Sequence, residues 1–146
     1  MSRQAKQTLV CKDLISLIEV VGKIADLIQR KDLIKFGEND SFKDRLRMYL
    51  EKTIDYIASS TSFYNIKYVE VEDIDRPMDM SIVINRLFFF TTNLFSILIK
   101  KEKDEKVINR SISSLIYYIK MLCSIYDIDS KKIIKNINDY QLNTEE

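Results

Sequence analysis

The sequence has few residues that break helices and few of the residues that enzymes most often use in catalysis. Its 146 residues include two glycines, one proline, two cysteines and no histidine. So few turn-forming residues cannot punctuate the many short strands of a sandwich or barrel, which excludes an all-β fold and favours long helices. The lack of histidine excludes Ser-His and Cys-His catalysis, and with two cysteines it excludes the usual zinc sites. Any bound metal would be a hard cation held by carboxylates.

The overall composition is that of one compact domain. Hydrophobic residues make up 46% of the chain and charged residues 31%, which at this length is enough to build a buried core. The formal net charge is +1. Nucleic acid is therefore not favoured as a partner, because phosphate backbones are bound by a clear excess of positive charge. Many Ile, Lys and Asn with few Gly, Pro and Ala are typical of an AT-rich genome, such as that of a phage or a low-GC bacterium.

The cysteines and the most apolar segment both indicate a cytoplasmic protein. Cys11 and Cys123 lie far apart, and no signal peptide precedes them, so we expect two reduced thiols. The most apolar segment, Ile82–Ile99, is interrupted by three polar residues: Asn85, Arg86 and Asn93. These interruptions make a buried helix a better interpretation than a membrane span, and no membrane partner is expected.

Apolar residues recur at three- and four-residue steps and predict four main helices and a short fifth. The predicted helices span residues 8–34, 42–63, 80–101, 107–126 and 131–140. Gly37 is available to end the first helix, Asp40 or Ser41 to cap the second, and Asp129 or Ser130 to cap the fifth. Residues 67–79, an alternating acidic stretch before Pro77, are predicted to be a linker.

Two segments of the chain repeat each other. Residues 56–66 align without gaps with residues 118–128 and share Tyr-Ile, Ser, Tyr and the closing Ile. This repeat predicts two helical hairpins, over residues 8–66 and 80–143, joined by the linker. Because neither hairpin can bury its apolar face alone, we expect a single all-α domain over residues 1–146. Its architecture would be a four-helix bundle with a short C-terminal helix.

Both ends of the chain resemble one known family, the MazG-like all-α nucleoside triphosphate pyrophosphohydrolases. Residues 125–143 are similar to the closing segment of that family, where a tyrosine-rich turn precedes a last helix. Residues 17–24, with 35–40, resemble its first helix and the following loop. In active members of the family, a Glu-x-x-Glu pair on one helix and a Glu-x-x-Asp pair on the next hold magnesium against a triphosphate. Carboxylates at this spacing project from the same side of a helix.

The acidic pairs that the resemblance requires are missing from this sequence. In the first hairpin the corresponding residues are Val20, Lys23, Tyr49 and Lys52. In the second hairpin Ser111 and Ser114 stand at the Glu-x-x-Asp positions, and residues 91–93 contain no acid. The resemblance therefore implies a pseudoenzyme-like member that has the fold without the catalysis, and no cofactor is expected.

A rearranged magnesium site is the alternative. Helix 8–34 carries Glu19 and Asp26, and helix 42–63 carries Glu51 and Asp55. At about 100° per residue, both pairs lie nearly opposite the apolar stripes of their helices, so we expect them to face water. If a different packing brought them together, the protein would be a divergent magnesium-dependent pyrophosphohydrolase.

The polar residues of the most apolar helix suggest a binding site. Arg86 and Asn93 are seven residues apart and share a helix face among phenylalanines, where a buried charge needs a partner. The partner is a linker acid, such as Asp73 or Asp75, a helix C-terminus, or an anionic ligand such as a nucleotide phosphate. The candidate ligand-binding residues are Arg86, Asn93, Ser111, Ser114, Tyr117 and Tyr118.

These observations favour a non-catalytic binding or regulatory protein that binds a nucleotide-type ligand or a partner protein. A structural helical subunit of a larger assembly is a further alternative. Helix 80–101 is apolar nearly all round and rich in phenylalanine. Such a helix belongs at the centre of a bundle or in a subunit interface, so we also expect a homodimer.

Overall fold

The chain is an all-α bundle, as the sequence predicts. The computed structural model describes residues 2–33, 41–62, 64, 79–100 and 104–134. These contain α1 (Arg3–Gln29), α2 (Phe42–Thr61), α3 (Met80–Leu98) and α4 (Glu105–Ile125), and a further helix begins at residue 130. The described part of the chain contains no strand. Gly37, Asp73 and Asp75, with nearly all of the predicted linker, lie outside the described residues.

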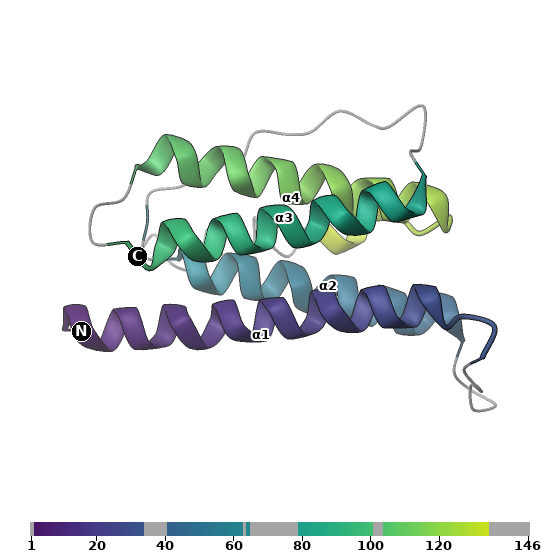
Figure 1. The fold of residues 1–146 in the computed structure, drawn as a ribbon, viewed down its shortest axis with the longest axis horizontal. Helices are drawn as coiled ribbons and strands as arrows, with labels where there is room; N and C mark the ends of the chain where they lie inside the picture. Colours follow the sequence, from purple (N-terminus) through teal and green to yellow (C-terminus); the bar gives the residue numbers. More distant parts are fainter. Residues whose placement is uncertain (1, 34–40, 63, 65–78, 101–103, 135–146) are drawn as a thin grey trace.

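The four helices form two antiparallel hairpins, α1 with α2 and α3 with α4, and α1 also packs against α3 (Figure 1). The two predicted hairpins are therefore confirmed. Helix α3 runs in the same direction as α2 and antiparallel to α1 (Figure 1). The end of α1, the starts of α2 and α3 and the end of α4 consequently meet at one end of the bundle.

Aromatic contacts tie this end together. The Tyr126 ring lies 5.0 Å from the Phe42 ring, and its hydroxyl donates to the Met80 sulfur over 3.7 Å. The ammonium group of Lys31, just beyond α1, lies 4.9 Å from the centre of the Phe42 ring, a cation–π contact. Residues from the ends of all four helices are thus fixed relative to one another.

Most helix starts follow from a capping side chain. The Ser41 hydroxyl accepts from the Asp44 backbone N–H at 3.1 Å, and the Asp129 carboxylate accepts from the Lys131 N–H at 3.1 Å; both caps are predicted from the sequence. Helix α1 begins earlier than predicted because Ser2 caps it, accepting from the Ala5 N–H at 3.1 Å. It also ends earlier, at Gln29 rather than residue 34.

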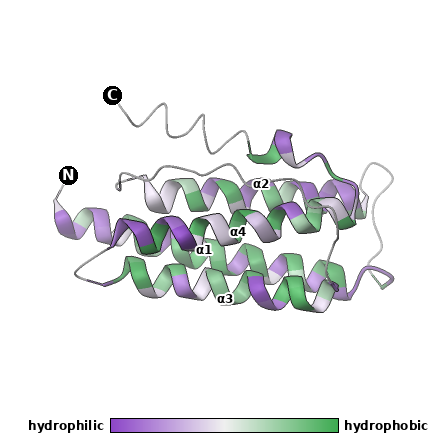
Figure 2. Cartoon of the chain, turned by 90° about the horizontal axis from the view of Figure 1, so that it is seen from above, coloured by the Kyte–Doolittle hydropathy of each residue, from purple (hydrophilic) through white to green (hydrophobic). Residues whose placement is uncertain are grey.

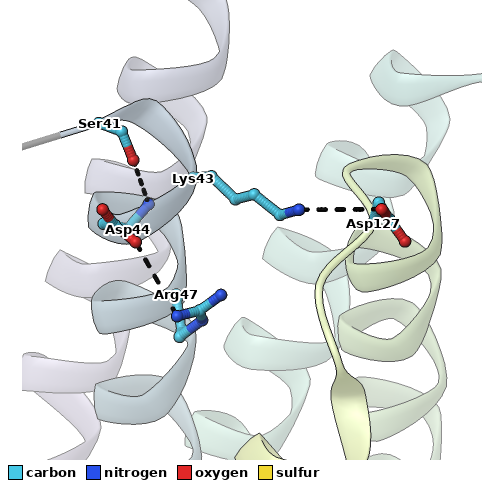
Figure 3. A network of polar contacts seen from close by, with 5 residues as sticks. All are labelled: Ser41, Lys43, Asp44, Arg47 and Asp127. Atoms are coloured by element: carbon cyan, nitrogen blue, oxygen red, sulfur yellow. Dashed lines mark hydrogen bonds and ion pairs between the residues drawn. The ribbon is translucent and has the colours of Figure 1, made fainter.

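The end of α4 is closed by a Schellman motif. Asp127 has a φ of 55°, and the Ile128 N–H donates back to the Cys123 carbonyl at 2.8 Å. This is the left-handed residue and the returning hydrogen bond that end many helices. Figure 3 shows Lys43 reaching from the first turn of α2 toward Asp127, with 3.9 Å between ammonium and carboxylate.

One apolar core is shared by both hairpins. Its fully buried members come from all four helices and include Leu14, Leu17, Leu50, Ile54, Leu87, Leu94, Ile112 and Leu115. Ile128 and Ile133, which follow α4, are buried with them. Within the first hairpin, the Ser59 hydroxyl on α2 donates a hydrogen bond to the Asp13 carboxylate on α1 at 2.6 Å.

Helix α3 is not enclosed on all sides, so of its two predicted positions, the bundle centre or a subunit interface, it does not occupy the bundle centre. One face, with Val83, Leu87 and Leu94, is fully buried, whereas Ile82 and Phe89 on the opposite face are 46% and 54% exposed. Hydrophobic colouring continues along most of α3 in Figure 2. Among the described residues, α3 is the one helix long and apolar enough to cross a membrane by length and composition.

Candidate functional site at the α3–α4 seam

The centre of the candidate site is a hydrogen bond between two helices. The Asn93 side-chain amide on α3 donates to the Ser111 hydroxyl on α4 at 3.1 Å. Ser111 is buried, with 2% of its surface exposed, and Asn93 is half-buried. Antiparallel packing of α3 and α4 brings these residues level, so two members of the predicted site are in contact.

A chain of four aromatic rings crosses the same seam. Phe89 and Phe90 meet edge to face at 5.1 Å, Phe90 stacks on Tyr118 at 5.8 Å, and Tyr118 meets Tyr117 edge to face at 5.1 Å. Such geometries stabilise aromatic pairs beyond simple burial. Phe89, at one end of this series of rings, is exposed to solvent. Both tyrosines are among the predicted site residues, whereas Phe89 and Phe90 are not, although Phe90 lies one helical turn from each of Arg86 and Asn93.

Arg86 is exposed, contrary to the prediction that its charge is buried among phenylalanines. The exposed residues Ile82, Arg86 and Phe89 follow a helical spacing on the outer side of α3. Because the Arg86 guanidinium is in contact with water, it is not desolvated and does not need an acidic partner from the linker. It makes no hydrogen bond or ion pair with another described residue.

Ser114 does not join the Asn93–Ser111 pair. Its hydroxyl donates to the Arg110 carbonyl of its own helix at 3.0 Å, a bond that satisfies the hydroxyl within α4. The Thr91 hydroxyl is a polar group near this pair that is not among the predicted site residues. It is buried on α3 without a hydrogen-bond partner, and the residue is 1% exposed.

Three of the four carboxylates of the alternative metal site are exposed to solvent. Glu19, Asp26 and Asp55 are exposed, as predicted, and Glu51 is half-buried. Asp26 instead pairs with Arg30 one turn further along α1, at 3.5 Å. Partial burial raises the pKa of Asp55. No group of three or more potential metal ligands occurs within the described ranges.

The positions that correspond to the acidic pairs of the first hairpin have separate structural roles. Val20 is a core residue with 4% exposure, and Tyr49 packs half-buried against the core. Lys23 and Lys52 are exposed to solvent. These four side chains do not form a polar cluster.

Both cysteines are free thiols, as the sequence predicts. Cys11 is half-buried, whereas Cys123 is buried in the core. Burial, with a smaller contribution from the negative charge of Asp129, raises the pKa of Cys123 to about 12. A thiol with this pKa is protonated at neutral pH and is a poor nucleophile or metal ligand.

Comparisons of the chain with protein-family models, with curated proteins and with solved structures give no match. The resemblance to the MazG-like family therefore remains a prediction from the sequence.

Proposed function

We propose that this chain is a non-catalytic, MazG-like binding protein that acts in the cytoplasm. The supporting observation is the Asn93–Ser111 hydrogen bond. On the proposed alignment, Ser111 stands at the first acidic position of the Glu-x-x-Asp pair. An uncharged amide–hydroxyl pair there joins two helices but cannot supply the carboxylate oxygens that magnesium prefers.

The proposed ligand is a nucleotide-type anion bound at the outer side of the seam. Arg86 offers a guanidinium that no described residue engages, and guanidinium groups bind phosphate in a bidentate manner. Phe89, three residues further along α3, offers an aromatic ring that is 54% exposed. A base stacked on Phe89 with its phosphate on Arg86 would use both groups at once.

A partner protein is the second candidate. It is favoured because most of the other candidate ligand-binding residues are already in contact with residues of this chain. Ser111, Ser114 and Tyr118 already contact other residues of the chain. An exposed aromatic next to an arginine is also the composition of a protein-binding hot spot.

A thermal-shift screen over linear and cyclic nucleotides, with and without magnesium, tests the ligand proposal. A nucleotide at about 100 times its Kd stabilises the folded state by about 2.7 kcal/mol, a rise in Tm of about 5–10 °C for a chain of this size. The shift should not depend on magnesium and should occur without turnover.

Arg86→Met should abolish this shift, whereas the control Arg47→Met, an exposed arginine on α2 that pairs with Asp44, should leave it unchanged. A shift that survives in Arg86→Met contradicts the assignment of Arg86. If no nucleotide gives a shift, the partner-protein proposal replaces the nucleotide proposal. A structural subunit would show no nucleotide response and would instead co-purify in a larger assembly.

A further inference from the structure

Helices α1 and α3 share an outward face that is apolar along its centre. On α1 it is formed by Ile15, which is 53% exposed, with half-buried Ile18 and Gly22. On α3 it is formed by half-buried Phe88 and Phe95. These phenylalanines lie on the side of α3 opposite Phe90 and Asn93, which contact α4. Both helices lie in front of α2 in Figure 1.

Gly22 is the one glycine among the described residues, and it lies well inside α1. A Cβ built on it would meet no atom within 4 Å. Glycine within a helix costs about 1 kcal/mol relative to alanine, and packing within the chain does not require its small size here. A glycine at such a position allows another backbone to approach closely.

A hollow of about 460 Å³ lies at one end of the same face, where α1 ends and α3 begins. Ile28, Met80 and Ile84 supply apolar lining, and the polar lining comes from Gln29, Asp79, Ser81 and Asn85. The face therefore has an exposed apolar side chain, Ile15, near the middle of α1 and a partly apolar hollow where α1 ends.

The exposed side chain and the hollow are equally spaced about Gly22. Ile15 comes seven residues before Gly22, and Ile28 and Gln29 come six and seven residues after it. Consider a two-fold axis that passes Gly22 and places the two copies of α1 antiparallel. A residue that comes a given number of positions before Gly22 in one copy then lies level with the residue the same number of positions after Gly22 in the other copy. Ile15 of one copy then lies level with the hollow of the other, on both sides of the axis. We propose that a second copy of this chain docks on the α1–α3 face in this arrangement, which is self-complementary as a two-fold dimer requires.

Charge and size are consistent with this occupant. Along the outer edge of α1, Glu19 and Lys23 are exposed and opposite in sign. The same axis brings Glu19 of one copy within about one helical turn of Lys23 of the other. Two adjacent helices that are about 28 Å long and together about 20 Å wide present a flat area of roughly 600 Å². Protruding side chains add to this area, which is close to the roughly 800 Å² that each partner buries in a stable interface.

Sedimentation equilibrium of the full chain over a range of concentrations tests the proposal. We expect a mass of twice the 17.3 kDa chain at high concentration, and the single-chain mass at the same concentration for Ile15→Glu and Gly22→Arg. The space around Gly22 means that Gly22→Arg should still fold, which its circular dichroism and Tm will verify. Leu9→Glu is the matched control, because Leu9 is 42% exposed on α1 but lies about 120° around the helix from Ile15. It should remain dimeric.

A cross-linking experiment locates the axis. In a Cys11→Ser background, oxidation of Gly22→Cys should give a covalent dimer, because the axis brings the two residues 22 together. Met48→Cys, on α2 and 44% exposed in the parent chain, should remain monomeric on a denaturing gel. A wild-type chain that is monomeric at every concentration overturns the proposal, as does a dimer that survives both Ile15→Glu and Gly22→Arg. Nucleotide-induced thermal shifts are measured separately on Ile15→Glu. A shift that persists in this variant shows that nucleotide binding does not depend on the dimer, so the two proposals can fail independently.

Discussion

The Asn93 amide on α3 donates a hydrogen bond to the Ser111 hydroxyl on α4 over 3.1 Å, at a point where both helices pass the core. The bond is uncharged and satisfies Ser111, which is otherwise enclosed. It joins the two helices of the second hairpin. In the proposed function, it also stands where a metal-binding family would place a carboxylate.

This pairing predicts strong coupling between two substitutions. Ser111→Ala leaves the Asn93 amide without its partner and should lower the free energy of unfolding by about 1–2 kcal/mol. Combining it with Asn93→Leu should cost less than the two single effects added together, because the double variant leaves no unpaired polar group. Urea unfolding of the four proteins measures the coupling. Thr92→Ala, whose hydroxyl bonds only within α3 among described residues, serves as the control. Strictly additive effects would show that the bond contributes nothing.

The left-handed residue after α4 predicts a stabilising substitution. Asp127 has a φ of 55°, which costs a side-chain-bearing residue about 1 kcal/mol more than glycine. Its ion pair with Lys43 is long and exposed and therefore worth little. Asp127→Gly should raise the free energy of unfolding by about 0.5–1 kcal/mol, measured from the urea midpoint. Asp127→Ala keeps the Cβ and should give no such gain. Equal gains from glycine and alanine would refute the conformational explanation.

The two thiols should react at very different rates. Burial raises the pKa of Cys123 to about 12, so iodoacetamide at pH 8 should label Cys11 first and Cys123 only after unfolding.

The raised pKa of Cys123 also means that the unfolded chain loses the thiol proton at lower pH than the folded chain. The contribution of Cys123 to stability is therefore complete below about pH 9 and falls as the pH rises toward 12. Peptide mass spectrometry measures the labelling, and equal rates at both cysteines would contradict the buried position.

The cap of α3 should depend on pH. The Asp79 carboxylate accepts from the Ser81 backbone N–H at 2.9 Å and from its hydroxyl at 2.9 Å, and these bonds lower the pKa of Asp79 below 3.8. A carboxyl with a lowered folded-state pKa stabilises the protein above its unfolded pKa and loses that effect as the pH falls. Asp79→Ala should lower the Tm at pH 7, and the difference from wild type should shrink below about pH 4. A difference that is constant from pH 7 to pH 3 would rule out the ionised cap. Asp79→Ser, which keeps a capping oxygen, should lose less.

Sequence periodicity predicted most of the fold because helix stripes and caps are local properties. Ser41 and Asp129 cap where their side chains permit, and the buried stripe of Leu14 and Leu17 is where the three- and four-residue spacing places it. The exposure of Arg86 was missed although α3 carries a polar stripe. Ser81, Asn85, Thr92 and Ser96 recur at helical spacing on the exposed side of α3, and Arg86 lies beside them. Phenylalanines on several sides of the helix obscured this stripe, so Arg86 was interpreted as buried.

The candidate site was predicted in part for the same reason. Asn93 and Ser111 are polar residues in apolar helices, which marks them individually. Their mutual contact depends on the register of two helices joined by a loop, which spacing alone does not fix. Phe89 and Phe90 were missed because phenylalanine in such a helix is read as core. The exposure of Phe89 becomes visible only when the helix is packed.

The proposed absence of metal-dependent hydrolysis can be tested by measuring pyrophosphate release from ribo- and deoxyribonucleoside triphosphates with magnesium. We expect release no faster than in the protein-free blank for every substrate. Magnesium-dependent conversion of any triphosphate to monophosphate and pyrophosphate, lost in a Glu51→Ala, Asp55→Ala double variant, would contradict it.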